Sequence, residues 1–365
     1  MRLCGSEPWS LSLLLMELNA PTPADLTSPS LIDPGRSRGP QDEFLSAFEL
    51  VRKPLLLGHV TPDADCLGSC LGLAGAMREQ GLDARIGLPP DCVPDRLAFM
   101  LELDPTIPVD RHVTPDSDRD ALLFLDTATE KRINLGTTIV LPTQAVRFSL
   151  DHHITNTDFA THNWVDPHAS STCEMIARLI LELGWRISPH VASLLYAGIH
   201  GDTGGFSLPP TTAESLQIAA DLVRAGADVT HIGEQLCRSQ GRRDFELLRR
   251  VYDHTTVVAD GLIAYSYLTY HDISESGCRP EDIDDQVSIP RALRGVRIAM
   301  LFSEGEPGVV RINLRGEGRT TVVELAQRFG GGGHPQSAGV RMKNKPIQDV
   351  ITMIVAAAEE HLKSH

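Results

Sequence analysis

Short apolar runs alternate with longer, helix-like stretches through the first two thirds of the chain. Runs of about four to eight apolar residues between turn signals are typical of strands buried inside a parallel sheet. Such runs predict strands over residues 54–60, 84–88, 121–125 and 146–150. The stretches between them predict helices over residues 43–53, 66–80, 94–103, 172–183 and 190–199. This alternation predicts an α/β fold built on a doubly wound parallel sheet.

The pattern changes in the last third of the chain. Helices are expected over residues 212–225, 229–239 and 242–257, followed by strands over 262–270, 296–302, 309–314 and 338–342 and helices over 322–329 and 347–362. This mixture predicts a second, smaller α/β domain. We therefore expect a flexible N-terminal extension over residues 1–42, a first domain over 43–210, a helical linker over 211–258 and a second domain over 259–365.

The composition narrows the class of protein. The chain has 365 residues, of which 42% are apolar and 22% charged, as in ordinary globular proteins of about this size. No apolar run approaches the roughly 20 residues that span a bilayer, so no membrane partner is expected. Seven cysteines without regular spacing argue against a disulfide framework and favour a reduced, cytoplasmic location. Cys66 and Cys70 are interpreted as small core residues of the first long helix.

Charge is distributed unevenly along the sequence. The formal net charge of −15 disfavours binding to long duplex nucleic acid. Residues 290–345 nevertheless contain ten Lys or Arg residues against four acids. Two interpretations of this local excess of positive charge stay open at this point, an ordinary solvated surface of mixed charge and a surface that binds an anionic ligand; the acidic remainder of the chain would repel a long strand.

Acids and imidazoles gather where the apolar runs end. They are Asp63 and Asp65 with His59, then Asp126, then Asp151 with His152 and His153, and finally Asp202 after a helix. The carboxyl ends of parallel strands meet at one edge of a sheet, so these side chains are expected to lie together. Clustered carboxylates require a compensating charge, and a divalent metal is the usual one.

The residue types favour a particular kind of metal site. Oxygen-rich clusters with two or three histidines suit Mn²⁺, Mg²⁺ or Co²⁺ better than a closed structural zinc site, which would use cysteines. Five carboxylates are too many for one ion and fit two ions that share a bridging acid. An isolated aspartate after a strand is more often a helix N-cap, and we leave the isolated histidines His162, His168 and His200 outside the site. The joint pattern carries the prediction.

The order and spacing of these motifs resemble a known family. G-H-V-T-P-D-A-D (58–65), L-F-L-D-T (123–127), S-L-D-H-H (149–153) and G-D-T-G-G-F (201–206) resemble the four motifs of the DHH phosphoesterase superfamily. V-R-I-N-L-R-G (310–316) with F-G-G-G-G-H-P-Q-S-A-G (329–339) resembles its DHH-associated C-terminal domain. The resemblance covers about residues 43–363 and implies a catalytic DHH domain followed by a substrate-binding domain.

The resemblance also implies a role for each matching residue. A first metal would be held by His59 and Asp63, a second by Asp65, His152 and Asp202, and Asp126 would bridge the two. Asp151 would orient a neighbouring imidazole, and His153 would face the scissile phosphate as a positioning group or proton donor. The substrate contacts would be Arg315, Gly331, Gly332, Gly333 and His334. The sequence departs from the family pattern at three positions. Asn313 and Gly316 stand where serines are common near the tail arginine, and Gly201 replaces a hydroxyl residue before Asp202.

Members of this superfamily cut different phosphoesters. Its pyrophosphatases and exopolyphosphatases carry another C-terminal domain, and its large RecJ-type exonucleases carry extra nucleic-acid modules. The compact two-domain form here resembles the RecJ-like nanoRNases. This implies a Mn²⁺-dependent enzyme, with Mg²⁺ or Co²⁺ as alternatives, in which two metal ions activate water to hydrolyse short single-stranded RNA and 3′-phosphoadenosine 5′-phosphate (pAp).

Two alternatives stay open at this point. One is a phosphodiesterase that acts on cyclic or linear dinucleotides such as cyclic di-AMP. The other is a catalytically silent nucleotide-binding regulator, against which the complete set of acids and histidines speaks. The sequence leaves a homodimer open, together with the polarity of digestion.

Overall fold

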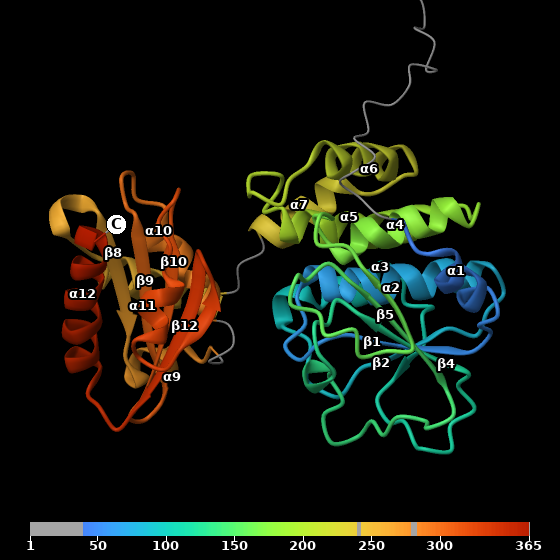
Figure 1. The fold of residues 1–365 in the computed structure, drawn as a ribbon, viewed down its shortest axis with the longest axis horizontal. Helices are drawn as coiled ribbons and strands as arrows, with labels where there is room; N and C mark the ends of the chain where they lie inside the picture. The colour runs from blue at the N-terminus through green and yellow to red at the C-terminus, as the bar shows by residue number, and fades with distance from the viewer. Residues whose placement is uncertain (1–38, 239–241, 279–282, 365) are drawn as a thin grey trace, which may run out of the picture. The chain divides into compact units, whose positions relative to one another are not determined.

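The computed structural model describes residues 39–238, 242–278 and 283–364 (Figure 1). Most of the N-terminal extension predicted over residues 1–42 lies outside this range. The described chain contains two six-stranded sheets, each with its own helices and its own hydrophobic core. None of the helices within the described ranges combines the length and apolar composition that a membrane crossing requires. The fold class expected from the sequence, α/β with two sheets, is confirmed.

The first sheet is wholly parallel and has the strand order β3-β2-β1-β4-β5-β6. Its strands are β1 (Pro54–Leu57), β2 (Arg85–Gly87), β3 (Val109–Asp110), β4 (Ala121–Leu125), β5 (Val146–Asp151) and β6 (His162–Val165). The chain winds outward from β1 to β3 and then returns to place β4 beside β1. The carboxyl ends of β1 and β4 therefore form the switch point at which open α/β sheets bind their ligands.

Helices cover one face of this sheet in layers (Figure 1). They are α1 (Asp42–Phe48), α2 (Ala64–Glu79), the 3-10 turn η1 (Asp95–Leu97), α3 (Phe99–Leu103), α4 (Thr172–Glu182), α5 (Pro189–Asp202), α6 (Ala213–Arg224) and α7 (Val229–Arg238). The predicted helix over 43–53 ends early, because the N–H groups of Arg52 and Lys53 donate to the carboxylate of Asp120 instead of continuing the helix.

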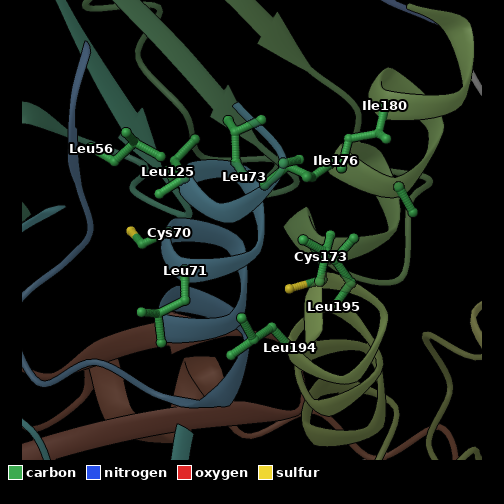
Figure 2. Packing of buried hydrophobic residues seen from close by; sticks show 14 of the residues in the cluster. Leu56, Cys70, Leu71, Leu73, Leu125, Cys173, Ile176, Ile180, Leu194 and Leu195 are labelled. Carbon is green, nitrogen blue, oxygen red and sulfur yellow. The ribbon is translucent and has the colours of Figure 1, made fainter. Parts of the chain in front are cut away.

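Helix α2 lies between the sheet and the pair α4 and α5, so it is buried on nearly every side. Figure 2 shows Leu73 of α2 on the side of Leu125 of β4 and Ile176 of α4, and Leu71 on the side of Leu194 of α5. A helix surrounded in this way must be apolar all round instead of amphipathic. Glycines on α2 let α5 approach, because a Cβ at position 68 would lie 2.6 Å from the carbonyl oxygen of Leu194.

The other face of the first sheet is covered mainly by irregular chain. Doubly wound sheets usually carry helices on both faces. Here the connection from β4 to β5 forms only the 3-10 turn η2 (Glu130–Arg132). Apolar residues of this connection and of the preceding loop, such as Ile133, Ile139 and Val113, pack against Leu57 and Phe124 of the strands. Irregular chain suffices because a few large apolar side chains bury this face.

The second sheet has the order β11-β12-β10-β9-β8-β7 and is antiparallel except between β8 and β9. Its strands are β7 (Thr256–Val258), β8 (Ile263–Leu268), β9 (Ile298–Glu306), β10 (Val309–Gly316), β11 (Gly332–His334) and β12 (Ser337–Lys343). Alternate residues of β10 are buried, which gives the sheet one core face beneath α11 (Val323–Gln327) and α12 (Ile347–Ser364).

Other helices pack against the opposite face at β8 and β9. They are α8 (Arg242–Asp253), α9 (Tyr270–Ser276) and α10 (Ser288–Arg291), with the 3-10 turns η3 (Ala259–Gly261) and η5 (Asp284–Val287). Of the three helices expected in the linker, α6 and α7 pack against α5, whereas α8 packs against β8 and α9. The four-segment division of the chain stays a prediction.

Candidate metal centre

The predicted ligands of the first domain converge at the carboxyl edge of the parallel sheet. His59 and Asp63 follow β1, and Asp65 lies in the first turn of α2. Asp126 follows β4, and Asp151 ends β5 and precedes His152 and His153. Asp202 ends α5. Three groups of potential ligand atoms each lie within 4.8 Å of one another: His59, Cys66 and Asp126; Asp126, His152 and His153; Asp65, His152 and Asp202. Shared members join them into one cluster.

His59 presents a lone pair to this cluster. Its Nδ1 lies 2.7 Å from the carbonyl oxygen of Val60, so Nδ1 carries the proton and donates. The other ring nitrogen, Nε2, lies 3.3 Å from a carboxylate oxygen of Asp126 and 3.7 Å from one of Asp63. Acceptor atoms face one another this closely only when a proton or a cation lies between them. Burial opposes the charged imidazole, but Cys66, Asp126 and Asp63 outweigh it and raise the pKa of His59.

Asp126 lies at the centre of the cluster and is 2% exposed. Its carboxylate is 3.3 Å from Nε2 of His59 and 3.6 Å from a ring nitrogen of both His152 and His153. The Thr172 hydroxyl donates to it at 3.3 Å. Its backbone is left-handed, with φ of 52°, a conformation that costs free energy in a non-glycine residue and gathers at functional sites. The side chain that a bridging ligand would need is therefore held where three imidazoles meet.

Asp65 is wholly buried at the start of another helix. Its two carboxylate oxygens accept hydrogen bonds from the backbone N–H groups of Thr172 and Cys173 at 2.7 and 2.8 Å, in the first turn of α4. Helix N-termini favour negative charge. Burial and then the nearby charge of Asp126 nevertheless raise the pKa of Asp65 to about 7. Each oxygen keeps a second lone pair for a cation.

Asp151 orients His153. Nδ1 of His153 lies 2.7 Å from Oδ1 of Asp151, and the Asn156 amide donates to Oδ2 at 2.6 Å. Asp151 is wholly buried, whereas the side chain of His153 is about a third exposed. Burial favours the neutral imidazole, but the Asp151 carboxylate outweighs it and raises the pKa of His153. His153 is therefore held with one edge against Asp151.

The donor set fits divalent cations. His152 Nε2 lies 3.2 Å from Asp202, and burial together with Asp65 holds the pKa of Asp202 well above its usual range. Such a buried group of carboxylates is costly unless a cation compensates the charge. Mn²⁺ and Mg²⁺ favour carboxylate oxygens as ligands, and the imidazole nitrogens of histidines complete the set here. The roles of these residues as ligands stay a prediction.

The second sheet carries the predicted substrate contacts. Arg315 lies on β10 with Arg311 and Asn313 on the same face, and its Cα is paired with that of Ser337 on β12. Its guanidinium donates to the Leu314 carbonyl at 3.1 Å. Ser337 supplies a hydroxyl residue beside Arg315 although Asn313 and Gly316 replace the expected serines. The sequence did not single out Ser337, because strand register decides this proximity.

The glycine run, which follows the helix predicted over residues 322–329, lies partly in the edge strand β11. A Cβ at Gly331 would lie 2.2 Å from the carbonyl oxygen of Gly339, and a Cβ at Gly333 would lie 2.4 Å from the carbonyl oxygen of Ser337. These two glycines therefore permit close contact between strands. Gly331 also donates its N–H to Ala326 at 2.9 Å, whereas Gly332 faces open space. The side chain of His334, which ends β11, lies outside the described part of the structure.

Three residues near the centre were not predicted as parts of it. Asn156 donates to Asp151, and Thr172 donates to both Asp65 and Asp126. The sulfur of Cys66 lies within 4.8 Å of ligand atoms of His59 and Asp126. The helix over residues 172–183 was predicted from the sequence, but the contact of its first turn with Asp65 links positions more than 100 apart. Cys66 is buried as expected of a core residue, and it also borders the site.

Comparison with known families agrees with this geometry. The model of the DHH family, N-terminal domain, matches residues 53–199, and that of the DHHA1 domain matches residues 260–364. The chain contains a DHH-family N-terminal domain followed by a DHHA1 domain. Its acids and histidines at the carboxyl edge of the first sheet lie within or just beyond the match to the DHH domain, since Asp202 follows residue 199.

Curated relatives of this DHH chain resemble it over most of its length. A bifunctional oligoribonuclease and PAP phosphatase NrnA of Thermus thermophilus is 29% identical over 86% of this chain and 92% of its own length. The protein of the same name from Bacillus subtilis is 28% identical over 88% of this chain and 99% of its own length. A cyclic-di-AMP phosphodiesterase, PdeA of Listeria monocytogenes, is 24% identical over 84% of this chain but 47% of its own length.

A solved structure with a similar fold supports the architecture. An exopolyphosphatase-related protein from Bacteroides fragilis superposes with a TM-score of 0.75 at 26% identity. The superposition covers 88% of this chain and 95% of the other.

Proposed function

We propose that this chain is a metal-dependent phosphoesterase that hydrolyses very short oligoribonucleotides and pAp. The observation that carries the proposal is the placement of Asp126 within 3.3–3.6 Å of three imidazoles at the switch point of the parallel sheet. The relatives named for oligoribonuclease and PAP phosphatase activity match nearly their whole length, which favours this substrate class.

We assign two divalent cations, most simply Mn²⁺, to the cluster. His59 and Asp63 would hold one, Asp65, His152 and Asp202 the other, and Asp126 would bridge them. Bound cations of this kind supply an activated water and neutralise charge during displacement at phosphorus. The four carboxylates and two imidazoles are consistent with that number, because a single ion would leave acids uncompensated.

His153 would handle the proton of the leaving oxygen. Asp151 accepts from Nδ1 and holds the ring in one orientation, while the pKa of His153 is raised by that carboxylate against the effect of burial. An imidazolium with Nδ1 fixed in this way can donate its second proton to a developing alkoxide. The same positive charge would also orient the phosphate before reaction.

The second domain would bind the remainder of the substrate. Arg311 and Arg315 share one face of β10, and Arg315 is paired with Ser337 of β12. A guanidinium with a neighbouring hydroxyl suits a phosphate or the edge of a base. One or two phosphates suffice for such a surface, consistent with short substrates. Gly332, which has open space beside it, allows a ligand to approach the backbone.

A second candidate is a phosphodiesterase acting on cyclic dinucleotides. The relationship to PdeA favours it, although the similarity extends over only 47% of that protein. A catalytically silent nucleotide-binding protein is a weaker candidate, because it would not need the buried carboxylates around His59 and His152.

One experiment separates these candidates. The purified protein with Mn²⁺ is given RNA of two to five nucleotides, pAp and cyclic di-AMP in parallel reactions. The proposal predicts fast loss of the short RNA and of pAp, with little loss of cyclic di-AMP. Preferred hydrolysis of cyclic di-AMP would reassign the chain to dinucleotide turnover, and no turnover of any of the three with metal bound would support a silent binder.

A further inference from the structure

The Cys66 thiol borders the metal centre. Cys66 lies in the first turn of α2 and is 1% exposed. Its sulfur, a ring nitrogen of His59 and a carboxylate oxygen of Asp126 all lie within 4.8 Å of one another. Three donors of different chemical type therefore meet on the side of the centre that contains His59.

The backbone leaves room for this sulfur at one specific place. A Cβ on Gly58 would lie 2.2 Å from Sγ of Cys66 and 3.5 Å from Sγ of Cys70. The absence of a side chain at position 58 thus permits the thiol to lie against the strand end that precedes His59. The thiol occupies that place through tight packing and has little freedom to turn away.

The donors differ between the two sides of the centre. Around His59 they are a thiol sulfur, an imidazole nitrogen, the Asp126 carboxylate and, 3.7 Å from His59, the Asp63 carboxylate. Around His152 the donors are nitrogen and oxygen, from Asp65 and Asp202. The group of one sulfur, one nitrogen and one oxygen donor favours Zn²⁺ or Co²⁺, whereas nitrogen and oxygen donors alone suit Mn²⁺ or Mg²⁺.

We propose that Cys66 is a metal ligand and that the His59 side of the centre takes a thiophilic divalent cation, Zn²⁺ or Co²⁺, in preference to the Mn²⁺ assigned above, which stays the ion of the His152 side. The inference rests on the proposed function only in placing a cation beside His59. On binding, the S–H bond of Cys66 breaks, a sulfur–metal bond forms and the proton passes to solvent water; no electron is transferred. The two sides of the centre then differ in metal preference.

The consequence is a mixed centre. Zn²⁺ would be retained on the His59 side under conditions where Mn²⁺ exchanges from the His152 side. Without a sulfur ligand, the same position would lose this preference, because first-row cations are distinguished here by ligand softness and geometry.

Cobalt spectroscopy tests the proposal without a turnover assay. Full-length protein is stripped with a chelator, loaded with Co²⁺ and examined in the near ultraviolet and the visible. A sulfur ligand gives a charge-transfer band in the near ultraviolet that nitrogen and oxygen ligands do not give. We expect this band in the wild type, its loss in Cys66→Ser and in Cys66→Ala, and its retention in Cys70→Ser and Cys173→Ser, two buried thiols outside the three-donor group.

The outcomes are separable from those of the substrate experiment. Visible cobalt bands in the wild type without the charge-transfer band would overturn the proposal, whether or not any variant folds. Retention of the band in both Cys66 variants would overturn it as well. If the band is present but neither short RNA nor pAp is hydrolysed, the proposed function fails and Cys66 remains a ligand. If short RNA and pAp are hydrolysed but the charge-transfer band is absent, the proposed function stands and Cys66 is not a ligand.

Discussion

Nδ1 of His153 lies 2.7 Å from a carboxylate oxygen of Asp151, a wholly buried residue. Asp151 is thus the group behind the imidazole that we place against the substrate. Because partners of this kind fix the orientation and the protonation of a histidine, Asp151→Asn should lower kcat by about 10- to 100-fold and change KM little. Steady-state kinetics on a short RNA would show this.

Asn156→Ala, which removes one hydrogen-bond donor to Asp151, should cause a smaller loss of kcat. A kcat of Asp151→Asn within about twofold of the wild type would contradict the assignment of Asp151.

Asp126→Asn should separate stability from metal binding. Burial raises the pKa of Asp126, and asparagine tolerates its left-handed backbone, so the chelator-treated variant should melt at the same temperature as the wild type or higher. Saturating Mn²⁺ at about 100 times its Kd stabilises a binding protein by about 2.7 kcal/mol, and the variant should gain less. Thermal melts with and without Mn²⁺ measure both effects.

The matched control for this variant is Asp91→Asn. Asp91 is also an aspartate with a left-handed backbone, at φ of 55°, but it is exposed and lies outside the three ligand groups. It should show the same gain from Mn²⁺ as the wild type. An equal gain in Asp126→Asn would mean that Asp126 is not a ligand.

Two glycine-to-alanine changes in helices should have opposite signs. Alanine at Gly68 of α2 would place a Cβ 2.6 Å from the Leu194 carbonyl oxygen, a backbone atom that cannot turn aside. We expect a loss of about 1–3 kcal/mol in the free energy of unfolding. At Gly233 of α7, no atom of the described residues lies within 4 Å of the Cβ position, apart from the chain neighbours and the backbone of the same helix. Gly233→Ala should therefore stabilise by about 0.5–1 kcal/mol. Urea unfolding of both variants tests the tight packing of α2 against α5; a stabilised Gly68→Ala would contradict it.

Arg315→Ala should weaken substrate binding and leave metal loading unchanged. Arg315 shares a face of β10 with Arg311, whereas the metal ligands belong to the first domain. We expect KM for short RNA to rise about tenfold or more, since hydrogen bonds to charged groups contribute about 1.5–3 kcal/mol. Arg328→Ala, which removes an exposed ion pair with Glu360, is the control and should leave KM near the wild type. Equal KM values for Arg315→Ala and the wild type would exclude this arginine from the binding surface.

Acid should remove a stabilising contact in the second domain. Asp272 accepts from Thr269 at 2.6 and 2.9 Å and from Arg250 at 2.8 Å, joining α9 to α8. Burial alone would raise its pKa, but these bonds outweigh burial and lower it. A group whose pKa is lowered on folding stabilises the fold above its unfolded pKa of about 3.9, and this contribution is lost as the pH falls through the folded value.

Asp272→Asn should therefore cost about 1 kcal/mol at neutral pH. The difference from the wild type should shrink as the pH falls below about 4. Urea unfolding at several pH values measures it. A difference that stays constant from neutral to acid pH would show that the charge of Asp272 contributes nothing.

Elements whose local signals agree with their burial could be predicted from sequence. The apolar runs of β4 and β5 and the Ser171 cap of α4 are examples, as is Gly81, which ends α2 in a left-handed conformation. Strand β6 was missed because an edge strand needs no continuous apolar run. Strand β11 was missed because glycines carry no β preference, and only pairing with β12 makes them a strand.

The candidate site could be predicted as a set of residues but not as a geometry. Asp63 is the N-cap of α2 and accepts a hydrogen bond from the Cys66 N–H at 3.0 Å, and it also neighbours His59. Its role as a helix N-cap is therefore compatible with a role as a metal ligand. The left-handed backbone of Asp126 and the contact of Asp65 with Thr172 depend on segments far apart in the chain. Local patterns carry no information about such contacts.

The most direct test of the central claim is hydrolysis of a short RNA before and after metal is returned. The full-length protein is stripped with a chelator, shown to remain folded by circular dichroism, and assayed on RNA of two to five nucleotides with and without Mn²⁺. The account predicts no turnover in the stripped protein, turnover on adding Mn²⁺, and none in Asp126→Asn under either condition. Turnover of the stripped protein at the Mn²⁺-loaded rate would contradict the assignment of the cluster as a metal-dependent phosphoesterase site.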